Sequence, residues 1–326
     1  MNFRFVFRAL SLALPALVCL SAATAVAQPA ACPPPASVPT LSPAESAQAL
    51  ANAPDRGLLW RIEKNGRSSW LYGTMHLGRA DWIFPGPQVL KGLLQSDTLA
   101  LEIDLSDPAT LATLSAPADA AAAARLLTPE RARRLHAQVA AACLPEGALN
   151  TLSPLMQATT LVILAARGAG LYGDFGTEMT LSALARGRGK RTAALETAEG
   201  QLKALQGETE SAQAEQIDAS LDQLESGVAR TQAEELAQVW ERGDRRRLAD
   251  YASWCGCVDT PADRRAMQRL LDDRNPGLAD GIARLHARGQ RVFAAVGALH
   301  MVGPHGLPAL MAARGFKVMQ VVPALH

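Results

Sequence analysis

The sequence has almost no excess of charge of either sign, since Lys and Arg number 32 and Asp and Glu number 31 among 326 residues. It therefore lacks the broad basic field with which proteins follow nucleic-acid phosphates, and we expect no nucleic-acid partner. The 25 Gly and 20 Pro follow no short period, which excludes collagen-like and low-complexity chains. With 48% hydrophobic residues the composition also excludes wholesale disorder.

Several familiar catalytic motifs are also absent. The chain contains no His-Glu-x-x-His, no Gly-x-Ser-x-Gly and no Gly-x-x-x-x-Gly-Lys-Ser/Thr sequence. Zincin proteases, serine hydrolases with a nucleophile elbow and P-loop enzymes therefore lose their usual support. Any chemistry in this chain has to come from a different constellation of residues.

The first 27 residues predict a secretory signal peptide. Arg4 and Arg8 precede an apolar stretch, residues 9–20, that is too short to cross a bilayer as a helix. Ala25-Val26-Ala27 has the small-x-small pattern of a cleavage site, so we expect cleavage after Ala27. No later uncharged run reaches membrane-spanning length. We therefore expect a periplasmic or secreted protein with no membrane span after cleavage.

Export changes the interpretation of the cysteines. Cys19 leaves with the signal peptide, and an even number remains in an oxidising compartment, where disulfides are the simplest prediction. The remaining residues are Cys32, Cys143, Cys255 and Cys257, and they allow three pairings, which the sequence leaves open. A metal site at the last two is a poorer alternative, because zinc loops usually have two to four residues between the cysteines rather than one.

The mature chain predicts an α/β fold. Residues 28–44 are rich in Pro, Ala and Ser and predict a tether, and residues 45–326 predict one domain. Short apolar segments predict strands at 58–63, 69–73, 98–104, 190–195, 291–296 and 316–322, with Asn65-Gly66 as a hairpin turn. Residues 106–189 and 197–289 are mainly helical. We expect a mixed β-sheet with an N-terminal hairpin, covered by helices and carrying two long helical insertions.

One short pattern occurs twice. Gly73-Thr74-Met75-His76 and Gly297-Ala298-Leu299-His300 each follow an apolar strand segment. A Gly at the end of a strand allows a sharp turn and a close approach of a ligand, and the His then lies over the carboxyl edge of the sheet, where α/β folds bind ligands. A single such His is more often a core or loop residue. The duplication favours a functional site.

Acidic residues also follow predicted strands. Glu102 comes after Leu99-Ala100-Leu101, and Glu196 comes after Ala193-Ala194-Leu195. Asp104 would share the face of Glu102 if the strand continued that far. A carboxylate at the end of a buried strand is costly unless it is paired or binds a metal. A salt bridge with Arg or Lys is the simpler alternative, but imidazoles with carboxylates are also the ligand set of a divalent cation with an open position for water.

Other polar residues have competing explanations. Arg274 can stabilise a developing oxyanion or pair with Asp272 or Asp273. His305 can support His300 or lie in a loop. Three further residues are expected in structural or surface positions: Asp174 as a helix N-cap, and His136 and His286 on helix surfaces.

Together these residues resemble the TraB/PrgY/GumN family. The resemblance covers residues 45–322 and, more distantly, extends to the Tiki metalloproteases and erythromycin-esterase-like proteins. It is carried by Leu71-Tyr72-Gly73-Thr74-Met75-His76, Ala100-Leu101-Glu102, Leu195-Glu196-Thr197 followed by Gln201, Arg274-Asn275, and Val296-Gly297-Ala298-Leu299-His300-Met301-Val302-Gly303.

This resemblance implies an exported, divalent-metal-dependent hydrolase with Mn, Co or Zn as the candidate ions. It places His76, His300 and Glu102 on the metal, with Glu196 or a metal-bound carboxylate as the general base and Arg274 holding or polarising the scissile group. Tiki proteins cleave peptide bonds near the amino end of a secreted substrate, so the expected partner is a peptide or protein. This chain differs from them in lacking a membrane anchor.

Two alternatives remain from other classes. In a metal-free, esterase-like hydrolase, a His would act as general base and Glu102 would orient it. A non-catalytic periplasmic protein would instead bind a peptide or a metal, or regulate a partner.

Overall fold

The computed structural model describes residues 32–206 and 209–323, so the predicted signal peptide and its cleavage site lie outside the described residues. The predicted tether is described from Cys32, and it has no regular structure before α1 (Pro43–Asn52), which Ser42 begins with a capping box. None of the residues of α1 is buried. The tightly packed part of the chain therefore begins at the first strand.

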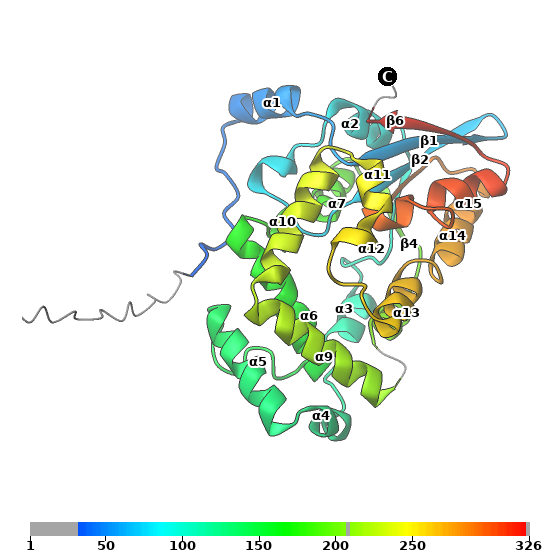
Figure 1. Ribbon diagram of the computed structural model, residues 1–326. Coiled ribbons are helices and arrows are strands. Elements are labelled where there is room, and N and C mark those ends of the chain that lie inside the picture. The colour runs from blue at the N-terminus through cyan, green and yellow to red at the C-terminus, as the bar shows by residue number, and fades with distance from the viewer. Residues whose placement is uncertain (1–31, 207–208, 324–326) are drawn as a thin grey trace, which may run out of the picture. The chain divides into compact units, whose positions relative to one another are not determined.

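A six-stranded sheet organises the fold, in the order β4-β3-β5-β2-β1-β6 (Figure 1). The strands are β1 (Leu58–Lys64), β2 (Arg67–Thr74), β3 (Thr98–Leu101), β4 (Arg191–Ala194), β5 (Val292–Gly297) and β6 (Lys317–Val322). β2, β5, β3 and β4 run parallel, whereas β1 is antiparallel to both β2 and β6. This confirms the predicted mixed sheet. Asn65 and Gly66 have φ values of 51° and 70°, as the predicted hairpin turn requires.

Helices occupy the connections between the strands. They are α2 (Pro87–Leu94), α3 (Pro108–Leu114), α4 (Ala120–Leu126), α5 (Pro129–Ala141), α6 (Pro154–Ala165), α7 (Thr177–Gly187), α8 (Ala198–Leu205), α9 (Glu210–Glu225), α10 (Val228–Glu241), α11 (Arg245–Ala249), α12 (Tyr251–Trp254), α13 (Pro261–Leu270), α14 (Asn275–Ala287) and α15 (Leu307–Ala313). Short 3₁₀ turns are η1 (Ala80–Ile83), η2 (Ala166–Ala169), η3 (Gly173–Phe175) and η4 (Ala298–Met301). None of the helices in the described ranges is long and apolar enough to cross a membrane.

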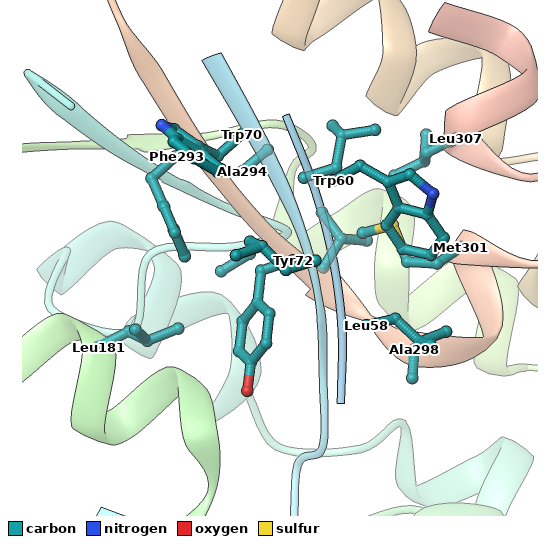
Figure 2. Packing of buried hydrophobic residues seen from close by; sticks show 14 of the residues in the cluster. Leu58, Trp60, Trp70, Tyr72, Leu181, Phe293, Ala294, Ala298, Met301 and Leu307 are labelled. Atoms are coloured by element: carbon teal, nitrogen blue, oxygen red, sulfur yellow. The ribbon is translucent and has the colours of Figure 1, made fainter. Parts of the chain in front are cut away.

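Both faces of the sheet are covered by helices. Figure 2 shows Trp70, Tyr72 and Phe293 on the side of Leu181 from α7, and Trp60 on the opposite side with Met301 from η4 and Leu307 from α15. The alternation follows from the pleat, because residues two apart on a strand share a face. Buried apolar side chains on both sides of one sheet explain why its strand sequences read as continuous apolar runs.

The two helical insertions pack against each other. The first, between β3 and β4, contributes α5 and α6, and the second, between β4 and β5, contributes α9. Leu135, Leu161, Ile217 and Leu221 belong to a separate apolar cluster formed by these helices. Arg131 of α5 also makes two hydrogen bonds to Asp218 of α9. The insertions therefore form a second core beside the one around the sheet.

The disulfide pairing that the sequence left open is Cys32–Cys143 and Cys255–Cys257. The first links the start of the described tether to the end of the first insertion's α5, across 111 residues. The second closes a loop of one intervening residue between α12 and α13. The first disulfide thus joins distant segments of the chain, whereas the second joins two residues that are close in the sequence.

The expectations for Asp104 and His286 are wrong. β3 ends at Leu101, so Asp104 does not share a strand face with Glu102, and its Oδ1 instead accepts hydrogen bonds from the backbone and hydroxyl of Ser106. His286 is buried rather than on the surface, because it continues the stripe of Leu278 and Ile282 on the inner side of α14. His136, in contrast, is exposed as expected.

His286 connects three elements through hydrogen bonds. Its Nδ1 lies 2.9 Å from the Ser69 hydroxyl, which also accepts the backbone N–H of Val292, and its Nε2 lies 3.1 Å from the carbonyl of Lys64. A neutral imidazole with its proton on Nε2 satisfies these contacts, because it donates to the Lys64 carbonyl and accepts from the Ser69 hydroxyl at Nδ1. Burial lowers the pKa of His286 below its usual value, which favours the same neutral form.

We expect His286 to make folding sensitive to mild acid. Its pKa is lower in the folded than in the unfolded chain, so below the unfolded pKa of about 6.5 the unfolded state binds the proton first and stability falls as the pH decreases. Urea unfolding between pH 7.5 and pH 5.5 should therefore show a smaller pH-dependent loss in His286→Gln than in the wild type. The matched control His136→Gln, at an exposed position, should keep the wild-type dependence, and an unchanged slope in His286→Gln would contradict this role.

Candidate active site

The predicted site residues lie at the carboxyl ends of four neighbouring parallel strands. His76 follows β2, His300 follows β5, Glu102 follows β3 and Glu196 follows β4. Because β5 lies between β2 and β3, the two Gly-x-x-His segments are adjacent in space although they are far apart in the sequence. The sheet therefore brings the predicted residues to a single edge.

The glycine of each repeated motif makes room for the other parts of the site. A Cβ on Gly73 would lie 3.2 Å from the Cα of Ala298, so this glycine lets η4, which carries His300, pack against the end of β2. Gly297 likewise leaves space between the side chains of the three predicted metal ligands. A Cβ there would lie 3.3 Å from Oε1 of Glu102, and it would also lie 3.6 Å from Cδ2 of His300 and 3.7 Å from Nε2 of His76.

The three predicted metal ligands thus surround one point, above Gly297. The backbone N–H of Gly297 also donates to Oε1 of Glu102 over 2.8 Å, which fixes the carboxylate beside that point. Glu102 and His300 are buried, whereas the side chain of His76 is 70% exposed. The exposed imidazole marks the side from which solvent or a substrate reaches the cluster.

Arg274 joins the two strand-end acids. Its Nη2 donates to Oε2 of Glu102 over 2.6 Å, and it also makes a short ion pair with Oε1 of Glu196, while Nε donates to Oε2 of Glu196 over 3.0 Å. The Gln201 amide bridges the same two carboxylates. The salt-bridge alternative weighed for both acids is therefore confirmed, with Arg274 as the partner. Neither Asp272 nor Asp273 takes that place in the hydrogen bonds of Arg274.

His76 has a carboxylate partner that the sequence did not reveal. Its Nδ1 lies 2.7 Å from Oε1 of Glu178, in the first turn of α7, and the same oxygen accepts from the hydroxyl of Thr74. The carboxylate that orients this imidazole is thus Glu178 and not Glu102. Only its position after Gly176-Thr177, at a helix start, signals it, and that signal is weak without the fold.

The loop that carries Glu178 is held close to His76 by glycines. A Cβ on Gly176 would lie 2.4 Å from the carbonyl oxygen of His76, and one on Gly78 would lie 2.0 Å from the carbonyl oxygen of Phe175. Neither position tolerates a side chain. Asp174 lies in η3 of this loop and is not an N-cap, because the residue that begins α7 is Gly176.

His300 is fixed by an amide instead of a carboxylate. Its Nδ1 lies 2.6 Å from Oδ1 of Asn275, the first residue of α14, and its Nε2 lies 3.4 Å from Nη1 of Arg274. Asn275 also donates to the backbone carbonyl of His305. His305 therefore supports the site through its main chain, and its ring is not the partner of His300.

A comparison with protein-family models matches residues 58–320 to the TraB/PrgY/gumN family. The chain belongs to this family. No curated protein and no solved structure matches the sequence. In this TraB/PrgY/gumN protein the match spans β1 to β5, the first four residues of β6 and every residue of the candidate site.

The two histidines of the TraB/PrgY/gumN site have pKa values that are shifted in opposite directions. The carboxylate of Glu178 raises the pKa of His76 above its usual value and favours a second proton on this imidazole, although solvent around the exposed ring screens the pair. Burial lowers the pKa of His300 to about 4, which keeps that ring neutral. Burial by itself raises the pKa of Glu102, but the adjacent His76, His300 and Arg274 outweigh this and bring it down to about 2.

The donor chemistry of His76, His300 and Glu102 fits a divalent cation, since two imidazoles and a carboxylate are usual ligands of Zn, Mn or Co. The arrangement as it stands is not that of a metal site: in residues 32–206 and 209–323, no three His, Cys, Asp or Glu side chains are grouped to hold an ion. Arg274 would have to move away from Nε2 of His300, and His76 would have to lose its Nε2 proton, before both rings became ligands.

We expect removal of Arg274 to destabilise this TraB/PrgY/gumN protein strongly. Arg274→Met would leave buried carboxylates without their cation, a loss of about 3–5 kcal/mol in typical buried pairs. Urea unfolding should show that Glu102→Gln in the same chain restores part of this loss. Arg291→Met is the matched control, because its partner Asp97 is more exposed and the pair is solvated, so the change should be much smaller. Equal losses in the two single variants would contradict the assignment.

Proposed function

We propose that this protein is an exported hydrolase that uses a divalent metal to cleave peptide bonds. The observation that carries the proposal is the convergence of His76, Glu102 and His300 on one point above Gly297. The resemblance of these residues to the Tiki motifs supports a peptide or protein as the substrate. The predicted signal peptide supports a periplasmic or secreted location, as does a set of four cysteines that are all paired in disulfides.

His76 and His300 would hold the metal through Nε2, and Glu102 would hold it through Oε1. Each imidazole already has its Nδ1 bonded to an acceptor, Glu178 or Asn275, which is how metal-binding histidines are usually oriented. When bound, the ion would polarise the scissile carbonyl and lower the pKa of an attacking water. Mn, Co and Zn all remain suitable for such a ligand set.

The other residues would act on the substrate and its protons. Arg274 presents a guanidinium between Glu102 and Glu196, and hydrogen bonds from it can stabilise the oxygen that becomes negative during attack. Glu196 would accept the proton of the attacking water, as the sequence comparison implies. Its two oxygens are held by Arg274, so Glu196 and Arg274 depend on each other for their positions.

A metal-free hydrolase is a second candidate, and the pair of His76 and Glu178 favours it. A carboxylate on Nδ1 fixes the tautomer and orientation of an imidazole that acts as general base through Nε2. In this version His76 would first have to lose the second proton that Glu178 favours, and Arg274, which already contacts both Glu102 and Glu196, would contact the substrate oxygen. Chelation distinguishes the two candidates.

We expect purified mature protein to hold about one divalent ion per chain and to cleave members of a peptide library. His76→Ala and His300→Ala should each lose the ion in elemental analysis, whereas the matched control His136→Ala should retain it. EDTA should abolish cleavage, and addition of Mn, Co or Zn should restore it. Cleavage that persists in EDTA would support the metal-free hydrolase, and a retained ion without any turnover would support a binding protein.

Gly297→Ala tests whether the point above Gly297, which His76, Glu102 and His300 surround, is the functional centre. Gly297 has φ −47° and ψ 140°, which alanine adopts without strain, so we expect the variant to fold. Its methyl group would lie between the three side chains and lower both ion binding and cleavage, by about 10²-fold if the displacement approaches 1 Å. The control Gly173→Ala, which meets nothing within 4 Å, should behave as wild type. Full activity in Gly297→Ala would reject this centre.

A further inference from the structure

The two disulfides constrain the chain to very different degrees. Cys32–Cys143 links residues 111 apart, whereas Cys255–Cys257 encloses Gly256 alone. A crosslink restricts the unfolded chain more strongly when its loop is longer. Because this effect is reciprocal, folding stabilises the long-range disulfide at equilibrium more than the Cys255–Cys257 link, even though Cys32 and Cys143 are both exposed to solvent.

Of the two cysteines in the short loop, Cys257 is the more exposed. Cys255 is fully buried at the end of α12, whereas Cys257 is half-buried and its neighbours Gly256 and Asp259 are exposed. Gly256 adopts φ +57°, which turns the chain outward between the two cysteines. A reagent therefore reaches the sulfur of Cys257 more easily than that of Cys255.

The buried sulfur, Sγ of Cys255, is positioned as the leaving group of the exchange reaction. The backbone N–H of Cys257 lies 3.1 Å from Sγ of Cys255, and a hydrogen bond of this kind stabilises a thiolate. The carbonyl of Cys255 is held by the side-chain amide of Gln232 from α10, so Cys255 stays anchored when the link opens. Attack at Cys257 with departure of Cys255 is thus the favoured direction of exchange.

We propose that Cys255–Cys257 is a thiol–disulfide exchange site that reacts with a dithiol reductant, whereas Cys32–Cys143 is a permanent structural link. A thiolate of the dithiol attacks Sγ of Cys257 and forms a mixed disulfide, the bond between the two cysteines breaks, and Cys255 leaves with the electron pair. The second thiolate of the dithiol then attacks its own mixed-disulfide sulfur and releases Cys257. Two protons protonate the cysteines, and the dithiol becomes a disulfide.

Graded reduction of the intact mature protein tests the proposal, with the second disulfide as an internal control. The protein is incubated with increasing dithiothreitol under native conditions and quenched with acid, and free thiols are alkylated and measured by mass spectrometry. We expect Cys255 and Cys257 to be half-modified at a dithiothreitol concentration at least about tenfold lower than Cys32 and Cys143. Simultaneous opening of both disulfides, or earlier opening of Cys32–Cys143, would overturn the proposal.

Two single variants test which of the two sulfurs an external reagent reaches more easily. Cys255→Ser leaves the half-buried thiol of Cys257, and Cys257→Ser leaves the buried thiol of Cys255. With oxidised glutathione, Cys255→Ser should form the mixed disulfide at least about tenfold faster than Cys257→Ser, and the difference should vanish in urea because it arises from burial. Equal rates in the folded proteins would refute the proposed direction of exchange.

Discussion

The ion pair of Arg274 with Glu102 is the interaction on which the candidate site depends. Glu102 directly follows β3 in a buried position, where an unpaired carboxylate would be costly. Arg274 neutralises it from the start of α14, and the same guanidinium holds Glu196 at the end of β4. One cation therefore joins both helical insertions to the carboxyl edge of the sheet, and the positions of His300 and Gln201 follow from it.

Much of this arrangement is predictable from the sequence because local signals agree with one another. The apolar runs at β2, β3 and β5 and the Asn65-Gly66 turn have local physical causes, and the structure confirms each of them. The grouping of the two Gly-x-x-His histidines with Glu102 also follows from strand order. In a parallel sheet, residues that end neighbouring strands meet at one edge.

The features that the sequence did not predict depend on contacts between distant segments of the chain. Glu178 lies in an ordinary helix start, and only the approach of its loop to His76, through Gly78 and Gly176, gives it a role. His286 has charged neighbours in the sequence, but the direction in which α14 faces the sheet buries it. The expectation for Asp104 was wrong because β3 ends three residues before it, a boundary that the alternating sequence Glu102-Ile103-Asp104-Leu105 does not mark.

The place of β5 has a consequence for the order in which this molecule assembles. β5 pairs with β2 and β3 on either side, yet it is the fifth of the six strands along the chain. While synthesis has not reached Val292, β2 and β3 have no common neighbour, and the long insertions cannot close their loops over a finished sheet. A chain interrupted before that point carries His76 and Glu102 on unjoined segments. The candidate site is therefore assembled only when the nearly complete polypeptide inserts its late strand.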